Sequence, residues 1–324
     1  MDAAAEEGRG EESAEYRACR LCPRRCGADR TAGGRGVCRE TAELRVAWTG
    51  LHHGEEPPIS GTRGAGGVFF AACPCHCIFC QNWQISAGGE GVKASRMGDE
   101  AFAAAARALL AAGAHNLDFV TPEHFWPHVR RLMERLRAEG ATAPAVWNSS
   151  GYTLPERVAD YARVVDIFLP DFKFTSPALA AEAMRAPDYP EVALAAIGRM
   201  VEEKGFLEPF DPTGEAPART GTLVRHLVLP GHAAESVEAL RLLRKKFGKW
   251  LPLSVMSQYT PTPAMAGRPP FDRPLRPEEY REVLDEVEAL GFEQVFIQPL
   301  EGAERDDPYR SPDFSSDRPF PSRS

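Results

Sequence analysis

Cysteine is missing from three quarters of this chain, since all eight cysteines of the 324 residues lie at or before Cys80. Residues 1–15 also lack an apolar core for export, so a secreted protein held by disulfides is a poor interpretation. No apolar run is long enough to cross a bilayer, because the nearest candidate, residues 101–114, is interrupted by Arg107. Excess positive charge is absent too: the formal net charge is −8, which argues against general nucleic-acid binding. These absences predict a cytoplasmic protein without a membrane partner, in which clustered cysteines bind metal.

Four of the cysteines fall within eight residues, at Cys73, Cys75, Cys77 and Cys80. They contain a C-x3-C-x2-C pattern, formed by Cys73, Cys77 and Cys80, with Phe79 before the last thiol. Three thiolates on one loop can hold three irons of a [4Fe–4S] cluster and leave the fourth iron open. The alternative is a zinc half-site at Cys77 and Cys80, but no later cysteine completes it. Cys75 is interpreted as a bystander thiol, because a fourth thiolate would close the open iron.

A second group of cysteines, Cys19, Cys22, Cys26 and Cys38, supplies four thiols to another site. Four thiolates satisfy either tetrahedral zinc or a closed iron–sulfur cluster, and the spacing leaves both open. Seven arginines lie around this group: Arg17, Arg20, Arg24, Arg25, Arg30, Arg35 and Arg39. They form either a solvated basic face or a docking surface for an acidic partner or electron donor.

The rest of the chain alternates between strand and helix patterns. Short apolar runs with β-branched or aromatic residues predict strands at 68–72, 117–121, 145–149, 166–170, 223–229, 253–258 and 294–298. Helical patterns lie between them, at 99–112, 124–139, 154–161, 189–204, 234–247 and 276–290. This rhythm predicts an α/β fold, a partial TIM-type (β/α)6–7 barrel of parallel strands, with a small N-terminal cysteine-rich metal-binding segment.

Composition divides the chain into four parts. Residues 1–15 are acidic and predict a disordered tail, and residues 16–60 form the cysteine-rich metal-binding segment and a linker. The core barrel is expected at residues 61–302. Residues 303–324 are rich in Pro, Ser and Asp and predict a second disordered tail.

Polar or turn-forming residues follow six successive predicted strands. They are Cys73, Thr121, Asn148, Asp171 with Lys173, residues 230–232, and Gln258. Ligands of parallel α/β folds bind at the carboxyl ends of the strands. We therefore expect these residues to share one rim of the barrel.

Several motifs, in chain order, carry a resemblance to a known family. They lie at residues 19–26, 54–61, 69–82, 116–122, 148–152, 166–173, 225–231 and 256–259. Together they resemble the radical S-adenosylmethionine superfamily, and within it an uncharacterised branch similar to pyruvate formate-lyase activating enzyme. The match spans about residues 17–300.

The resemblance implies a cofactor and a reaction. Cys73, Cys77 and Cys80 would ligate a [4Fe–4S] cluster, and S-adenosylmethionine would chelate the fourth iron. One electron from a low-potential donor, flavodoxin- or ferredoxin-like, would cleave the sulfonium to a 5′-deoxyadenosyl radical. That radical would abstract hydrogen from a substrate. The activase resemblance implies a protein or peptide target of the glycyl-radical kind, and a small-molecule substrate stays open.

Residues that would bind S-adenosylmethionine follow from the same resemblance: Phe79, Thr121, Asn148, Asp171, Lys173 and Gln258. The second-strand Gly-Gly-Glu motif of many relatives is absent, and residues 121–123 occupy its place. Lys173 would pair with the cofactor carboxylate, or else form a structural ion pair at the strand end. His226 is a weaker rim candidate, because alternation along its strand also permits a core position.

Two other classes of function remain open from the sequence. One is a non-catalytic iron–sulfur electron relay or metal-binding protein on the same fold. The other is a zinc-dependent nucleic-acid module fused to an inactive barrel, against which the acidic net charge argues. Cleavage of S-adenosylmethionine discriminates the radical enzyme from both.

Overall fold

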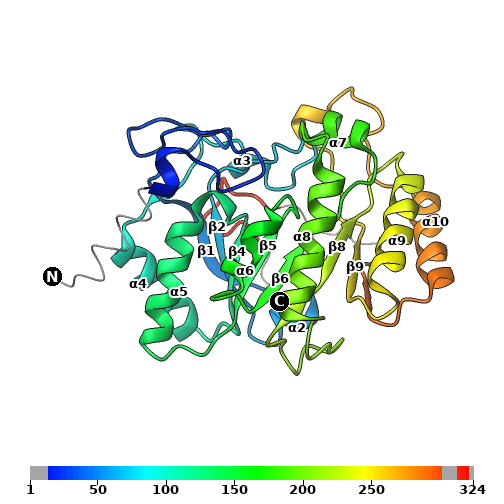
Figure 1. Cartoon of the computed structure of the whole chain (residues 1–324). Coiled ribbons are helices and arrows are strands. Elements are labelled where there is room, and N and C mark those ends of the chain that lie inside the picture. The colour runs from blue at the N-terminus through cyan, green and yellow to red at the C-terminus, as the bar shows by residue number, and fades with distance from the viewer. Residues whose placement is uncertain (1–13, 301–311, 321–324) are drawn as a thin grey trace.

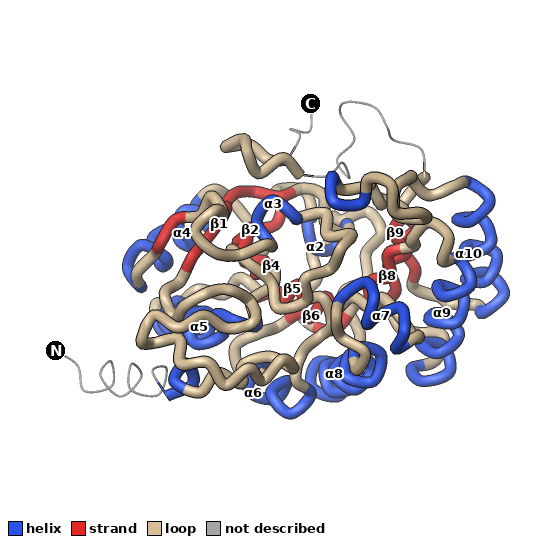
Figure 2. Tube along the Cα trace, turned by 90° about the horizontal axis from the view of Figure 1, so that it is seen from above, coloured by secondary structure: helices blue, strands red, loops and turns tan. Residues whose placement is uncertain are grey.

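The strands of this protein form an arc, and most of the long helices cover its outer side (Figure 1, Figure 2). The structure is a computed structural model that describes residues 14–300 and 312–320. The predicted tail at 1–15 therefore lies outside the described residues except at its last two positions. In the described part of the chain, no helix is both long enough and apolar enough to span a membrane.

In residues 14–300 and 312–320, ten strands form two sheets. The larger sheet has the order β3-β1-β2-β4-β5-β6-β7, and the smaller has the order β10-β9-β8. The strands of the larger sheet are β1 Arg45–His52, β2 Ala65–Phe70, β3 Ser95–Arg96, β4 Leu117–Val120, β5 Ala145–Ser149, β6 Ile167–Pro170 and β7 Gly221–Thr222. Those of the smaller sheet are β8 Val224–Leu227, β9 Leu253–Met256 and β10 Val295–Ile297.

The two sheets join where β6 meets β8. An isolated parallel bridge pairs Asp171 with Arg225, and the Phe172 amide donates to the Arg225 carbonyl oxygen at 2.8 Å. Strands β2, β4, β5, β6, β8, β9 and β10 therefore follow one another with parallel pairing. This open succession of parallel strands confirms the predicted partial barrel.

The N-terminal edge of the large sheet differs from the prediction. Strand β1 was expected to be part of a cysteine-rich segment and linker, yet it pairs antiparallel with β2, from Val46 opposite Phe70 to His52 opposite Ala65. A boundary between residues 60 and 61 would divide this pair. Because strand pairing satisfies the backbone of both segments, residues 45–60 belong structurally with the barrel.

Helices and short 3-10 turns connect the strands. They are α2 Pro57–Ser60, α3 Trp83–Ser86, α4 Asp99–Ala111, η1 Glu123–Phe125, α5 Trp126–Ala138, η2 Pro155–Arg157, α6 Val158–Tyr161, α7 Pro177–Met184, α8 Tyr189–Lys204, α9 Ala233–Phe247, η3 Pro263–Met265 and α10 Pro277–Leu290. Local sequence explains their ends. Pro277 starts α10, and the Glu279 carboxylate accepts from the Arg276 amide at 2.9 Å. Gly248, with a φ of 83°, ends α9 after a basic last turn.

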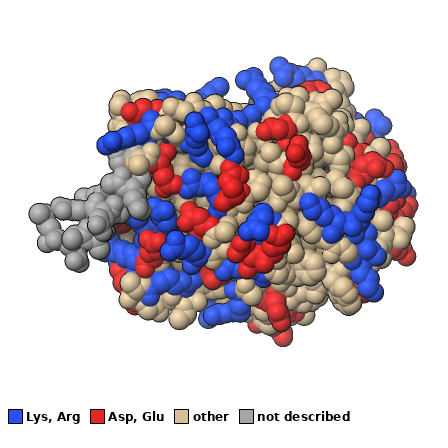
Figure 3. All heavy atoms as spheres, viewed as in Figure 1, with Lys and Arg blue, Asp and Glu red and all other residues tan. Residues whose placement is uncertain are grey.

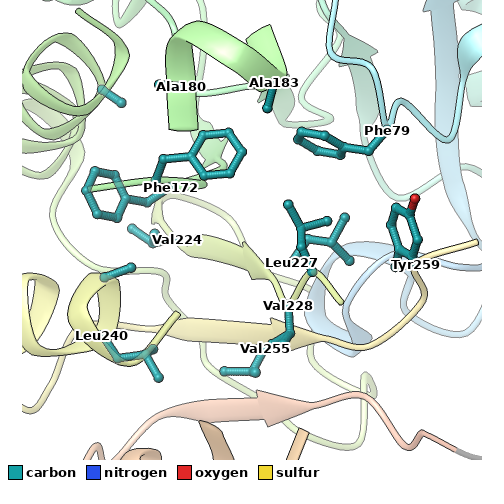
Figure 4. Close-up of a cluster of buried hydrophobic side chains, with 14 of the residues drawn as sticks. Phe79, Phe172, Ala180, Ala183, Val224, Leu227, Val228, Leu240, Val255 and Tyr259 are labelled. Carbon is teal, nitrogen blue, oxygen red and sulfur yellow. The ribbon is translucent and has the colours of Figure 1, made fainter. Parts of the chain in front are cut away.

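Buried side chains fill the space between the sheets and the helices. Figure 4 shows Phe172, Val224, Leu227 and Val255 packed together, with Phe79 from the cysteine loop at the same cluster. A second core under the large sheet contains fully buried Trp126, Trp147 and Tyr161. The ring centroids of Trp147 lie 5.5 Å from Trp126 and 4.4 Å from Tyr161.

We expect Trp147→Ala to lower the free energy of unfolding by about 3–5 kcal/mol, because it leaves a cavity in a closely packed aromatic cluster. Urea denaturation followed by circular dichroism measures the change. The matched control is Trp250→Ala, since Trp250 is 54% exposed and its removal should change the free energy by less than about 0.5 kcal/mol. Equal effects of the two substitutions would contradict the assignment of Trp147 to the core.

Candidate functional site

The cysteine loop follows β2 and ends at the short helix α3. Ala72 and His76 adopt φ angles of 72° and 52°, which turn the loop sharply at both places. Cys73, Cys77 and Cys80 are half-buried and free, whereas Cys75 is fully buried.

A cleft of about 340 Å³ opens beside this loop at the carboxyl ends of the parallel strands. Its walls include every residue that the sequence analysis assigned to the cluster and to S-adenosylmethionine: Cys73, Cys77, Phe79, Cys80, Thr121, Asn148, Asp171, Lys173 and Gln258. The structure thus brings together side chains that lie up to 185 positions apart (258 − 73), because parallel strands end at one edge. Its size lies near the lower end of small-ligand pockets.

The three thiols on the cleft have the donor chemistry of an iron–sulfur site. Burial raises the pKa of Cys80 to about 11, so iron would have to displace a proton from this thiol at neutral pH. Within residues 14–300 and 312–320, no three Cys, His, Asp or Glu side chains converge as a single-ion site. The ligands of a [4Fe–4S] cluster surround four separate irons and do not converge on one.

Cys75 does not line the cleft, although it contacts residues that do. Its Sγ lies 2.9 Å from Ser150 Oγ, and its amide donates to Cys73 Sγ at 3.4 Å. This thiol packs in the apolar core instead of lining the cavity. The arrangement fits the interpretation of Cys75 as a bystander.

Lys173 and Asp171 form an ion pair that faces the cleft. Burial alone would lower the pKa of Lys173, but the adjacent Asp171 carboxylate outweighs it and the pKa is raised. The Lys173 ammonium also lies 5.9 Å from the centre of the Phe79 ring. Lys173 is therefore a fixed cation at the rim beside the cysteine loop.

The segment after β4 carries a strained residue on the cleft. Thr121 has a φ of 59°, which is rare for a β-branched residue, and its amide donates to the Asn148 carbonyl oxygen at 2.8 Å. Glu123 points elsewhere: it is buried and accepts from the Thr153 hydroxyl at 2.9 Å. Burial raises the pKa of Glu123 to about 7.

Sequence reasoning missed a buried ionic group on the cleft. The Arg225 guanidinium from β8 pairs with Glu55 and Glu56, and it donates to Asn148 Oδ1 at 3.1 Å. Although burial raises the pKa of Glu55, the charge of Arg225 outweighs it and the pKa is lowered. Burial and the Glu55 charge raise the pKa of Asp118, which accepts from Asn148 Nδ2 at 3.3 Å.

Alternation along β8 determines which residue faces the cleft, Arg225 or the adjacent His226. Arg225 and Leu227 line the cleft, whereas His226 is fully buried on the other face, with Nδ1 2.7 Å from the Phe172 carbonyl oxygen. His226 is therefore a core residue, which decides between the two positions that the sequence had left open. In the sequence, two features could have indicated the ionic group of Arg225. They are the adjacent acids at 55 and 56 and the lone arginine in an apolar strand.

The C-terminal segment differs from the predicted disorder where it is described. Pro312 and Phe320 line the cleft, and Phe314 is buried. The Phe320 ring packs 4.1 Å from His52 and 5.3 Å from Phe69, measured between ring centroids. Two aromatic side chains thus anchor residues 312–320, which composition alone had assigned to a tail.

The second cysteine group lies on loops before β1. Cys19, Cys22 and Cys38 are buried and Cys26 is half-buried. Its arginines do not form one basic face. Arg30 is buried, and Arg25 and Arg35 pair with carboxylates on neighbouring loops. Figure 3 likewise shows basic and acidic side chains interspersed on one face of the molecule.

Comparison with known proteins gives distant relatives. No family model matches the chain. An uncharacterised protein of Methanocaldococcus jannaschii is 24% identical over 286 residues, which cover 87% of this chain and 77% of that protein.

Three solved structures with a similar course of the chain have TM-scores below 0.5. A tagged form of anSMEcpe with bound AdoMet has a TM-score of 0.46 at 14% identity, covering 75% of this chain and 60% of that one. HydG, a maturase of the [FeFe]-hydrogenase, has 0.48 at 11% identity, covering 71% and 50%. Methylornithine synthase has 0.45 at 15% identity, covering 76% and 77%. The chain thus spans about 60% of the first structure's length, and the assignment of function rests on the residues of the site.

The buried Glu123 predicts a pH-dependent stability. Its carboxyl ionises near pH 4.5 in the unfolded chain but near pH 7 in the fold, so burying it costs stability as the pH rises between these values. Glu123→Gln removes this penalty. We expect its free energy of unfolding, relative to that of wild type, to be about 3 kcal/mol higher at pH 8 than at pH 4. Urea denaturation at several pH values measures the difference. The exposed Glu134→Gln is the control, and a pH-independent difference for Glu123→Gln would contradict the prediction.

Proposed function

We propose that this protein is a radical S-adenosylmethionine enzyme whose [4Fe–4S] cluster is held by Cys73, Cys77 and Cys80. The observation that carries the proposal is their position. The three thiols lie on one cleft at the carboxyl ends of a parallel barrel, and Cys75 is buried and does not line it. Three ligands leave one iron open to a second ligand, and the cleft supplies polar groups to receive it.

When bound and reduced, such a cluster supplies the electron that cleaves S-adenosylmethionine to a 5′-deoxyadenosyl radical. The protein's own residues bind and orient the cofactor. Lys173 presents a cation for the cofactor carboxylate, and Asp171 holds its ammonium in place. Asn148 and Gln258 offer amide groups on the same cleft.

Apolar side chains complete the cleft and restrict water. Phe69, Leu227, Met256 and Phe320 line it from four separate segments. A reactive radical needs an enclosure that excludes water and competing hydrogen donors. The ionic group of Arg225, Glu55 and Glu56 lies in the same wall and provides polar contacts for a substrate.

The substrate and the electron donor are assigned by class. We propose a protein or peptide substrate with a glycyl-radical-type hydrogen, because the motifs of the chain resemble those of the glycyl-radical-enzyme activases. The donor is a low-potential flavodoxin- or ferredoxin-like protein. Trp83, three residues after Cys80, is 44% exposed and offers an apolar contact close to the cluster loop.

The deciding experiment is anaerobic reconstitution with iron and sulfide, reduction, and measurement of 5′-deoxyadenosine from added S-adenosylmethionine. Wild type and Cys75→Ala should both form the product, because Cys75 packs in the core. Cys73→Ala should form none. If reconstituted wild type forms none and its spectrum does not respond to S-adenosylmethionine, the electron-relay alternative replaces this proposal.

Lys173→Met should weaken binding of S-adenosylmethionine by roughly ten- to a hundredfold, because a charged hydrogen bond contributes about 1.5–3 kcal/mol. Anaerobic calorimetry on the reconstituted protein measures the Kd. Lys249→Met is the matched control, since Lys249 is a half-exposed lysine paired with Glu293 away from the cleft. An unchanged Kd for Lys173→Met would reduce Lys173 to a structural ion pair.

A further inference from the structure

Arg24 connects the two cysteine groups directly. It lies between Cys22 and Cys26 in sequence, yet its guanidinium reaches the loop that carries the catalytic thiols. It donates to the carbonyl oxygens of Pro74 at 2.9 Å and Cys75 at 3.3 Å. Further bonds run to the carbonyl of Met184 at 2.7 Å and to that of Arg185.

This side chain acts as a clamp on the cysteine loop. Pro74 and Cys75 lie between the first two proposed cluster ligands, Cys73 and Cys77. The guanidinium also lies 5.2 Å from the centre of the Tyr152 ring, which fixes its plane. A planar fork held in this way presents several donors in one orientation. Arg24 therefore restricts the backbone that presents the thiols.

Two further contacts join the same segments. His76 lies between the proposed ligands, and its Nε2 is 2.8 Å from the carbonyl oxygen of Val37, the residue before Cys38. Gly88, which follows α3, packs so closely that an added Cβ would meet the Cys38 carbonyl oxygen at 2.6 Å. The N-terminal cysteine segment thus contacts the catalytic loop and the chain that leaves it.

Arg30 is buried against the N-terminal thiols. It is 1% exposed, and its guanidinium donates to the His124 carbonyl oxygen at 2.7 Å and lies 3.6 Å from Cys19 Sγ. Its other hydrogen bonds run to the carbonyl oxygens of Glu40 at 3.1 Å and Thr41 at 2.7 Å, so no carboxylate of the described residues pairs with it. A buried cation requires a compensating anion, which thiolates bound to a metal supply.

Two of the thiols, Cys26 and Cys38, lie close to each other. A Cβ built on Gly36 would be 3.2 Å from Cys38 Sγ and 3.4 Å from Cys26 Sγ, so both sulfurs border the same glycine. The absence of a side chain there leaves room for a bound group between them. Cys19 joins them through the Arg30 contact.

We propose that Cys19, Cys22, Cys26 and Cys38 hold a tetrathiolate metal centre, and that Arg24 is a positioning residue that transmits its presence to the catalytic loop. The second half rests on the proposed function. A closed iron–sulfur cluster has the required chemistry, because its four thiolate ligands bind four separate irons, whereas the described thiols do not converge on a single ion. Without the centre, Arg24 loses its anchor, and the loop presents Cys73 and Cys77 correctly in only a fraction of molecules.

The metal centre is tested in a variant that lacks the catalytic ligands, Cys73→Ser with Cys77→Ser and Cys80→Ser. Elemental analysis of the purified, anaerobically reconstituted chain should still find about four irons with acid-labile sulfide. Stoichiometric zinc in place of iron overturns the iron–sulfur assignment. A folded triple variant without stoichiometric metal overturns the centre.

The positioning role is tested with Arg24→Gln in the full chain. We expect the apparent Kd for S-adenosylmethionine to rise about tenfold. This follows if only about a tenth of the molecules keep the loop in the conformation that binds the cofactor. The electron paramagnetic resonance spectrum of the reduced protein should shift less on adding the cofactor. Arg25→Gln is the matched control, because Arg25 occupies the same loop but is exposed and pairs with Glu156. Equal values for Arg24→Gln and wild type overturn the role.

A double-mutant cycle with Cys22→Ser tests whether the two effects share one path. If Arg24 transmits the effect of the centre, the double variant should be no worse than Cys22→Ser alone, and additive losses overturn the coupling. Hydrogen exchange of residues 73–80, measured on the four proteins of the cycle and on Arg25→Gln, does not depend on S-adenosylmethionine. Faster exchange in Arg24→Gln, but not in Arg25→Gln, supports the clamp even if wild type fails to bind the cofactor, which would overturn the proposed function alone.

Discussion

The buried guanidinium of Arg225 is the interaction on which the interior of this barrel depends. It lies at the junction of the two sheets, where the parallel bridge to Asp171 joins β6 and β8. Its charge is met by Glu55 and Glu56, which arrive from the opposite side of the barrel. Removing one partner of a buried ion pair costs several kcal/mol. The pairs of Arg225 with the two glutamates therefore stabilise the contact between these segments.

That constraint shapes the cleft. Glu55 and Glu56 precede α2, which Figure 1 places at the opposite end of the strands from α3 and the cysteine loop. The cavity is lined by thiols, by this ionic group, and by apolar side chains from β2, β8 and β9. Such a site can orient a charged cofactor near the thiols and still leave polar contacts deeper in the barrel for a second molecule.

The N-terminal arginines have a role inside the molecule. Arg24 binds loop carbonyls and Arg30 is buried beside Cys19, so neither is available to a partner. Carbonyl oxygens in a sharply turned loop have no strand or helix to accept from, and a guanidinium satisfies several of them at once. The segment before β1 is thus part of the support of the catalytic loop.

The sequence by itself determined the cysteine pattern, the alternation of strands and helices, and the rim from Thr121 to Gln258. These follow from local spacing, because parallel strands place their carboxyl ends on one edge whatever their exact packing. Only the tertiary structure decided the pairing of Arg225 with Glu56, 169 positions away, and the positions of Arg24 and Phe320. Such contacts depend on which faces of distant segments meet, and no local periodicity records that. For the same reason, alternation along β8 did not decide whether His226 lies at the rim or in the core. The packing on the two faces of β8 decides it.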